Sequence, residues 1–428
     1  MKIYRVGDPL FACWLERLRN RGEVLESRVA EEVQRVIGDV RERGDRALLD
    51  YTARWDGFQV SSPQDLVIDR ARMEEAYLAL PRDLAGALEL ARDRIERFHQ
   101  AQKERSWFLY EEKGAILGQK VTPLERVGAY VPGGRASYPS SLLMNVIPAR
   151  VAGVKEVVVA SPTPQGEVNE ALLGAAYLAG VDRIYRVGGA QAVAAMAYGT
   201  ELIPPVDKIV GPGNIYVATA KRMVFGKVDI DMVAGPSEIL VLADETANPS
   251  YVAADLLSQA EHDPLASAVF ITPSMDLARE VVREVETLLE GLATSATARE
   301  ALANYGGAVV CSTLDEGIEL VNKLAPEHLE ILTRDPWGVL PSINHAGAIF
   351  LGPYSPEPMG DYMAGPNHVL PTGGRARFSS PLSTGDFMKH SSVVSMSREA
   401  FLELKDGVVT LARWEGLPAH ARAVKMRE

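Results

Sequence analysis

Hydrophobic residues recur at helical spacing in two charged segments near the start of the chain. In residues 26–55, Val33, Val36 and Val40 lie on one face of a helix, with charged residues between them. Residues 71–104 show the same spacing. The pattern predicts that both segments are helical and that two short strands come after them, at 115–117 and 126–131.

From residue 150 to 236 the pattern becomes regular, and short apolar runs alternate with helical segments. The run 156–160 is largely valine, as expected for a strand that is covered on both faces. The further strands are predicted at 183–187, 208–210 and 228–230, and the helices at 168–179, 189–198 and 214–224. Strands that alternate with helices in this way indicate βαβ units and a parallel sheet.

A second alternating block begins at residue 239. Its strands are predicted at 239–242, 268–272 and 308–310, and its helices at 249–262 and 275–291. Residues 352–392 are rich in Gly, Pro, Ser and Thr, and we interpret them as a long functional loop or a linker. Helical character returns around 398–403 and 416–427.

These elements predict an α/β protein with two Rossmann-like parallel-sheet domains, one inserted in the other. We expect residues 26–129 and 238–380 to form one discontinuous domain. Residues 130–237 would form the domain inserted in it. Small appendages are expected at 1–25 and 381–428.

Composition and charge narrow the class of protein. The chain has 428 residues and a formal net charge of −12, with no long Lys or Arg run. A nucleic-acid binder needs a basic face that neutralises phosphates, so we expect no nucleic-acid partner. No apolar run approaches the length of a membrane span, and the first residues have no signal core. The two cysteines, Cys13 and Cys311, favour a reducing compartment, and we expect a soluble cytoplasmic enzyme.

The end of the helix predicted at 249–262 carries a candidate metal-binding pair. Gln259 and His262 are three residues apart, so both side chains lie on one helix face. Imidazole nitrogen is a common zinc ligand, whereas an amide oxygen is less common. On spacing alone, a histidine that caps the helix end is the favoured interpretation, because a lone Q-x-x-H is a weak signal of a metal site.

A second pair comes after a helix that Pro326 should end. Glu327 and His328 stand at the start of a predicted strand, where adjacent side chains point to opposite faces. A bent backbone could still aim both at one substrate. A Glu and a His together could divide general acid–base work. The alternative is an ordinary surface turn.

Three more positions could complete such a site. Asp361 in the long loop and His420 in the tail would give Gln259 and His262 a four-residue oxygen and nitrogen set, which suits Zn²⁺ and also Mn²⁺ or Co²⁺. Ser237 stands in a tight Ala-Gly-Pro-Ser turn, where it is either a substrate contact or a plain turn serine, because no nucleophile-elbow motif surrounds it.

Dinucleotide binding is not evident from a standard motif, because no G-x-G-x-x-G occurs. Two glycine turns, at 188–191 and 211–214, each come after a predicted strand and open a helix. That placement suits a pyrophosphate at a helix N-terminus. From the sequence, the chain either binds a dinucleotide in an unusual way or binds none.

Taken together and in order, these segments resemble the histidinol dehydrogenase family. The resemblance spans nearly the whole chain. It rests on Y-V-P-G-G at 130–134, G-P-G-N at 211–214, I-D-M-V-A-G-P-S-E at 230–238, L-S-Q-A-E-H at 257–262, A-P-E-H-L-E at 325–330, G-P-N-H-V-L-P-T at 365–372 and E-G-L-P-A-H at 415–420.

The resemblance implies zinc-dependent oxidation of L-histidinol to L-histidine, the last step of histidine biosynthesis. It implies two NAD reduced per turnover, through an aldehyde. It also implies an intertwined homodimer, in which the tail reaches the active site of the partner subunit.

The resemblance further implies a role for each matching residue. It gives zinc ligands at Gln259, His262, Asp361 and His420, NAD contacts at Tyr130, Gln191 and Asn214, and substrate contacts at Ser237, His328, His368, Glu415 and the four zinc ligands. Glu327 and His328 are our candidates for the catalytic acid–base pair.

Two other functions remain open from the sequence. One is a zinc-dependent dehydrogenase of another amino alcohol or of a sulfonated polyol. The presence together of Glu327, His328, His368 and Glu415 favours histidinol. The other is a non-catalytic metal- or nucleotide-binding protein, which would have no need of an acid–base pair.

Overall fold

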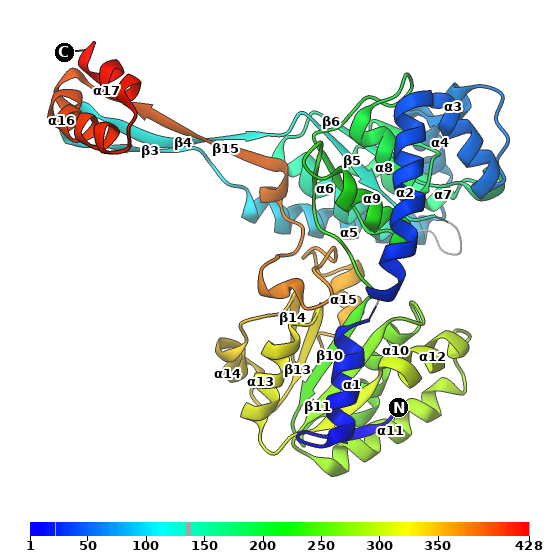
Figure 1. The fold of residues 1–428 in the computed structure, drawn as a ribbon. Helices are drawn as coiled ribbons and strands as arrows, with labels where there is room; N and C mark the ends of the chain where they lie inside the picture. The colour runs from blue at the N-terminus through cyan, green and yellow to red at the C-terminus, as the bar shows by residue number, and fades with distance from the viewer. Residues whose placement is uncertain (22, 134–137, 428) are drawn as a thin grey trace.

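The structure is a computed structural model that describes residues 1–21, 23–133 and 138–427. Two α/β bodies lie one above the other, and a long arm extends from them to one side (Figure 1). Within the described residues, no helix has both the length and the apolar character needed to cross a membrane.

The first body, uppermost in Figure 1, is built on a six-stranded sheet with the order β2-β7-β6-β5-β8-β9. Strand β2 is antiparallel to β7, and the other neighbours are parallel. The strands are β2 (Val67–Ile68), β5 (Arg126–Tyr130), β6 (Glu156–Ala160), β7 (Arg183–Tyr185), β8 (Lys208–Val210) and β9 (Asp229–Ile230). The valines of β6 are buried, because helices cover both faces of the sheet.

Helices form a covering layer on each face of this sheet. One face is covered by α4 (Arg70–Ala79), α5 (Arg82–Gln102), α6 (Pro139–Ala152) and α7 (Glu170–Ala179). The other is covered by α2 (Glu23–Arg43), α3 (Asp45–Tyr51), α8 (Gly189–Tyr198) and α9 (Ile215–Val224). The segment 71–104, predicted to be helical throughout, is divided between α4 and α5, because Pro81 cannot continue a helix.

The second body is an all-parallel sheet with the order β1-β12-β11-β10-β13-β14. Its strands are β1 (Ile3–Arg5), β10 (Glu238–Ala243), β11 (Ser267–Thr272), β12 (Gly307–Val310), β13 (His328–Leu332) and β14 (Ala348–Leu351). Helices α10 (Pro249–Ala260), α11 (Met275–Leu289) and α12 (Ser295–Tyr305) pack on one face. Helices α1 (Pro9–Arg19), α13 (Leu314–Leu324) and α14 (Pro336–Val339) pack on the other.

The fold confirms two parallel-sheet domains with one inserted in the other, but it corrects which segments form each domain. The helices of residues 26–129 were assigned to the domain of residues 238–380, and they pack instead on the first sheet: α2 against α8 and α9, α4 against α7, and α5 against α6. Residues 1–25 are not a separate arm, because β1 pairs with β12 and completes the second sheet. Helical periodicity shows that a helix has an apolar face, but not which sheet covers it.

The arm is an antiparallel sheet with two helices at its far end. It consists of β3 (Trp107–Tyr110), β4 (Ile116–Pro123) and β15 (Met388–Ser395), followed by α16 (Arg398–Trp414) and α17 (Pro418–Lys425). The predicted appendage 381–428 therefore also needs residues 107–123 from the middle of the chain. The arm holds the C-terminal helices far from both bodies (Figure 1).

Candidate active site

A small cavity lies where the two bodies meet. It has a volume of about 80 Å³ and is lined from both sides. The first body contributes Gly211 and Pro212 after β8, Lys221 in α9 and Asp231 after β9. The second body contributes Ser237, Glu327, His368 and Thr372, from near the amino ends of β10 and β13 and from the long loop. The predicted substrate contacts Ser237 and His368 therefore line the same cavity as Glu327.

Glu327 and His328 are buried, so the surface-turn interpretation is wrong. Their exposed fractions are 7% and 5%. Helix α13 ends at Leu324, and the next residue, Ala325, has a φ of 51° that turns the chain sharply before Pro326 and β13. This turn supplies the bent backbone that the two adjacent side chains needed. The Glu327 Oε2 atom lies 3.7 Å from His328 Nδ1.

The hydrogen bond of His328 fixes which ring nitrogen can act as a base. His328 Nδ1 lies 2.8 Å from the backbone carbonyl oxygen of Glu238. A carbonyl oxygen only accepts, so Nδ1 carries the hydrogen and Nε2 presents a lone pair. Nε2 is buried and has no hydrogen-bond partner among the described residues. It is therefore free to accept a proton from a bound molecule.

Glu238 supports this pair, and sequence analysis did not single it out. The backbone N–H of Glu238 donates to Glu327 Oε2 at 2.8 Å, and the N–H of Glu327 donates to Glu238 Oε2 at 3.3 Å. Arg21 Nη2 pairs with the other Glu238 oxygen at 2.6 Å. An acidic residue that opens the buried apolar strand β10 was the available signal, because such a charge needs a partner.

Burial sets the proton affinities of the pair. Removal from water, and next the charge of Glu238, raise the pKa of Glu327 well above its usual range. Burial lowers the pKa of His328, so its imidazole is neutral at pH 7. The ionised carboxyl group of Glu327 and the neutral imidazole of His328 can therefore each accept a proton.

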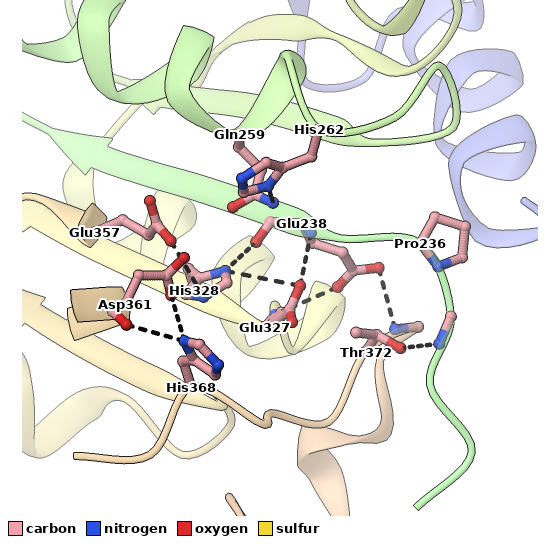
Figure 2. A network of polar contacts seen from close by, with 12 residues as sticks. Pro236, Glu238, Gln259, His262, Glu327, His328, Glu357, Asp361, His368 and Thr372 are labelled. Atoms are coloured by element: carbon pink, nitrogen blue, oxygen red, sulfur yellow. Dashed lines mark hydrogen bonds and ion pairs between the residues drawn. The ribbon is translucent and has the colours of Figure 1, made fainter. Parts of the chain in front are cut away.

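Carboxyl groups lie on the other side of the His328 ring (Figure 2). Glu357, in α15 (Glu357–Tyr362), places Oε1 3.7 Å from His328 Nε2. Asp361 in the same helix lies 3.6 Å from His368 Nδ1, which also donates to the Asp361 backbone oxygen at 3.0 Å. Ligand atoms of His328, Glu357 and Asp361 lie within 4.8 Å of one another, a spacing at which they could hold a metal ion.

Glu357 is a further residue that sequence analysis missed. Its side chain is 1% exposed, and burial raises its pKa to about 9. Its backbone N–H donates to Glu330 Oε1 at 2.7 Å, and burial raises the pKa of Glu330 to about 10. The segment that contains Glu357 was interpreted as loop, so its helical turn and its position beside His328 could be found only in the folded chain.

Gln259 and His262 lie side by side at the end of α10, as their spacing predicted. Gln259 Nε2 is 3.1 Å from His262 Nδ1 (Figure 2). Gln259 is 1% exposed, and its side-chain oxygen has no hydrogen-bond partner among the described residues. A buried oxygen without a donor is costly unless it is satisfied by a ligand, and a cation is a suitable one. The oxygen and nitrogen donors at this site thus fit a divalent metal.

Glu415 and His420 are not near this group within one chain. Glu415 follows α16 and His420 lies in α17, both exposed at the end of the arm. Of the four predicted zinc ligands, Asp361 lies in the group of side chains that could hold a metal ion. Gln259 and His262 appear in the same close view (Figure 2), whereas His420 lies on the arm.

The three predicted NAD contacts lie along the carboxyl edge of the first sheet. Tyr130 ends β5, and its hydroxyl accepts the Gly189 N–H at 3.1 Å. Gln191 lies buried in the first turn of α8, with its side-chain oxygen unpartnered among the described residues. Asn214 caps α9, accepting from the N–H groups of Tyr216 and Val217 at 3.0 and 3.2 Å.

The strand order explains why this edge suits a ligand. From β5 the chain adds β6 and β7 on one side and β8 and β9 on the other. Such a reversal leaves a crevice at the carboxyl ends of the two central strands, where open α/β sheets bind ligands. A crevice of this kind facing a buried Glu–His pair across an interdomain cavity defines a two-domain α/β enzyme.

Comparisons with known proteins identify the family of this enzyme. A sequence model of the histidinol dehydrogenase family matches residues 19–428. The chain is 53% identical over 427 residues to the histidinol dehydrogenase of Syntrophotalea carbinolica, covering 100% of this chain and 99% of that protein. It is 53% identical over 414 residues to that of Aquifex aeolicus, covering 97% and 96%.

A solved structure agrees with this match. The crystal structure of histidinol dehydrogenase from Elizabethkingia anophelis superposes with a TM-score of 0.93 at 35% identity, covering 100% of this chain and 98% of that one. The chain belongs to the histidinol dehydrogenase family. It is an oxidoreductase of histidine biosynthesis that acts on a small-molecule substrate.

Proposed function

We propose that the protein oxidises L-histidinol to L-histidine, depends on zinc, and reduces two NAD through an aldehyde intermediate. The observation that carries the proposal is the buried Glu327–His328 pair beside the interdomain cavity, with Glu357 and Asp361 close enough to His328 that the three could hold a metal ion. A histidinol-dependent release of NADH tests it, and other amino alcohols and a sulfonated polyol serve as competing substrates.

Zinc would be held by Gln259, His262 and Asp361 of one subunit and by His420 of the partner subunit. The unpartnered oxygen of Gln259 supports this set. When bound, zinc would hold and orient the substrate, whose imidazole and amine are both good zinc ligands. Ser237 and His368 would contact the substrate from the cavity wall, and Glu415 of the partner subunit would contact it from the arm.

His328 would handle the proton in the first oxidation. Its Nε2 lone pair takes the hydroxyl proton of histidinol while a hydride leaves the same carbon for NAD, which gives the aldehyde. The Glu238 carbonyl oxygen holds the ring in the required tautomer through Nδ1. NAD would bind in the crevice at Tyr130, Gln191 and Asn214.

Glu327 would act in the next step. Its carboxylate takes a proton from water as the water oxygen attacks the aldehyde carbon. His328 returns the proton it took in the first oxidation to the aldehyde oxygen, which gives the hydrated aldehyde and leaves the imidazole neutral again. His328 then accepts the hydroxyl proton of the hydrate as the second hydride leaves for NAD, and the product is the carboxylic acid. The burial and raised pKa of Glu327 support this role, because a group of higher proton affinity is the stronger base.

Exposed apolar side chains on the arm support a dimeric assembly. Its strand β3 exposes four apolar side chains, Trp107, Phe108, Leu109 and Tyr110, and Trp414 in α16 is 88% exposed. Apolar surface of this kind usually marks an interface with another chain. We propose a homodimer in which each arm lies on the partner subunit and brings Glu415 and His420 to the partner's site.

Shared sites predict that two inactive variants restore each other. In a mixed dimer of His328→Asn and His420→Asn, one site carries both changes and the other carries neither. Unfolding and refolding an equal mixture is expected to recover about a quarter of wild-type activity, because half of randomly paired dimers are mixed and each has one intact site. A mixture of His328→Asn with Glu327→Gln should not recover the second oxidation, since both changes lie in the same body and every site then carries one of them. A first mixture that also stays inactive would contradict shared sites.

The cysteines are predicted to be dispensable. Cys13 is exposed on α1, and burial raises the pKa of Cys311 to about 11. A covalent thiohemiacetal route needs a thiolate near the substrate, and neither residue lines the cavity. Both are free thiols, which fits a reducing compartment such as the cytoplasm.

Replacing both cysteines with alanine should leave steady-state activity within about twofold of wild type, since neither thiol acts as a nucleophile in our account. Loss of the second oxidation in this variant would refute the non-covalent route.

A further inference from the structure

A buried ion pair in the first body has no part in the proposed chemistry. Lys221 in α9 and Asp231, just after β9, are bonded to each other, and their side chains are 2% and 1% exposed. A buried ion pair adds little net stability, because the cost of removing two charges from water offsets their attraction. Its role must therefore lie in what the two groups hold in place.

The pair holds both backbone polar groups of Gly211. The Gly211 N–H donates to Asp231 Oδ2 at 2.8 Å, and Lys221 Nζ donates to the Gly211 carbonyl oxygen at 2.8 Å. Asp231 Oδ1 also accepts the Met232 N–H at 2.6 Å. Strand β8 ends at Val210, so Gly211 stands at the point where the chain leaves the sheet. The pair thus fixes the direction of the chain on both sides of this residue.

The backbone of Gly211 packs closely against the end of β5. Its φ is +105°, and a Cβ atom built on it would lie 2.1 Å from the carbonyl oxygen of Tyr130. The turn after β8 is therefore pressed against the end of β5, which is where the sheet order reverses. The turn therefore lies at the carboxyl ends of the two central strands, where open α/β sheets bind ligands.

The turn that begins at Gly211 lies beside the binding places of both ligands of the proposed reaction. Asn214 caps α9 and is a proposed NAD contact, and Tyr130 is another. Gly211, Lys221 and Asp231 also line the cavity that Ser237 and Glu327 face from the other body. The pair therefore lies behind the surface at which the cofactor and the substrate would meet.

We propose that Lys221 and Asp231 are positioning residues that lock the turn 211–214 in its NAD-binding form. This inference rests on the proposed use of NAD. The pair touches neither the hydride nor the reacting carbon; it acts through Gly211 and the placement of Asn214 against Tyr130. Its loss weakens NAD binding and leaves the metal cluster of the second body intact.

The test removes both charges together, so that no lone charge is left buried. In the full dimeric enzyme, Lys221→Met combined with Asp231→Asn should raise the Kd of NADH, measured by its fluorescence without substrate, about tenfold, the size expected for losing a hydrogen bond to a charged group. KM for NAD should rise with it. KM for histidinol and the zinc content per subunit should stay within about twofold, an energy difference below 0.5 kcal/mol.

A neighbouring ion pair is the matched control. Lys208 and Asp229 are 2.8 Å apart on β8 and β9 of the same sheet, but neither lines the cavity. Lys208→Met with Asp229→Asn should leave NADH affinity unchanged. If the Lys221 double variant does not fold, Lys221→Gln with Asp231→Asn tests the same claim, because two amide side chains can still make hydrogen bonds in this place without leaving a charge buried.

The outcomes separate the inference from the proposal beneath it. If the wild-type enzyme and the Lys221 double variant bind NADH equally well, the positioning role alone is overturned. A parallel loss of NADH affinity, histidinol affinity and zinc also overturns it, because that is the result of general damage to the fold. A wild-type enzyme that binds no NADH overturns both the proposed use of NAD and the positioning role.

Discussion

Replacing His328 with asparagine is expected to slow both oxidations by about 10²–10⁴-fold, the usual contribution of a positioned general base. The side chain would still fit its buried place and could donate to the Glu238 carbonyl oxygen, but the Nε2 lone pair would be gone. Because both hydride steps release a hydroxyl proton in our account, neither histidinol nor the aldehyde should escape the loss. The two rates are measured separately by supplying each compound with NAD.

Two further measurements show whether this loss is chemical. His345→Asn is the control, because His345 lies in the second body outside the cavity, and it should leave both rates unchanged. The acid limb of the wild-type pH profile should lie at lower pH than an exposed histidine would give, since burial lowers the pKa of His328 and the base form persists. A variant that loses only one of the two oxidations would contradict the role of His328 in both.

Replacing Glu327 with glutamine is expected to stop the reaction halfway. The first oxidation should fall less than about tenfold, whereas the second should fall by about 10²–10⁴-fold, because only the second needs water to be activated. Glutamine keeps an oxygen that can accept the Glu238 N–H, so the local backbone should remain in place. NADH released per histidinol should approach one, and the aldehyde should be trapped by an added hydrazine or amine.

The control for this change is Glu319→Gln, an exposed carboxylate on α13. It should leave the rates of both steps and the yield of NADH at wild-type values. Equal loss of the two oxidations in Glu327→Gln would contradict the division of work between Glu327 and His328.

The sheets of both bodies follow from sequence pattern more readily than the contacts that surround them. The valine run of β6 and the alternating helices predicted the parallel sheet of the first body, and the structure confirms the order of these elements. The spacing of Gln259 and His262 predicted that they share a helix face, and their side chains are in contact. Such features depend on residues close together in the sequence, where periodicity is informative.

The missed features depend on residues far apart in the chain. The buried Glu238 pairs with Arg21, which is 217 residues away. Glu357 belongs to the site because it lies beside His328, at the start of β13. Strand β1 is too short to show a period of its own, and only its pairing with β12 makes it part of the sheet. Strand β15, in a segment rich in polar residues, pairs with β4 from the middle of the chain. No pattern among neighbouring residues in the sequence predicts these pairings.

The yield of NADH tests the account most directly. Limiting histidinol is incubated with excess NAD and the zinc-loaded enzyme, and NADH is counted at completion by absorbance. Our account predicts two NADH per histidinol, one for each of the two hydride transfers. It also predicts that a chelator abolishes the reaction and that added Zn²⁺ restores it. A yield of one NADH, or full activity in an enzyme shown to contain no metal, would contradict the zinc-dependent four-electron oxidation.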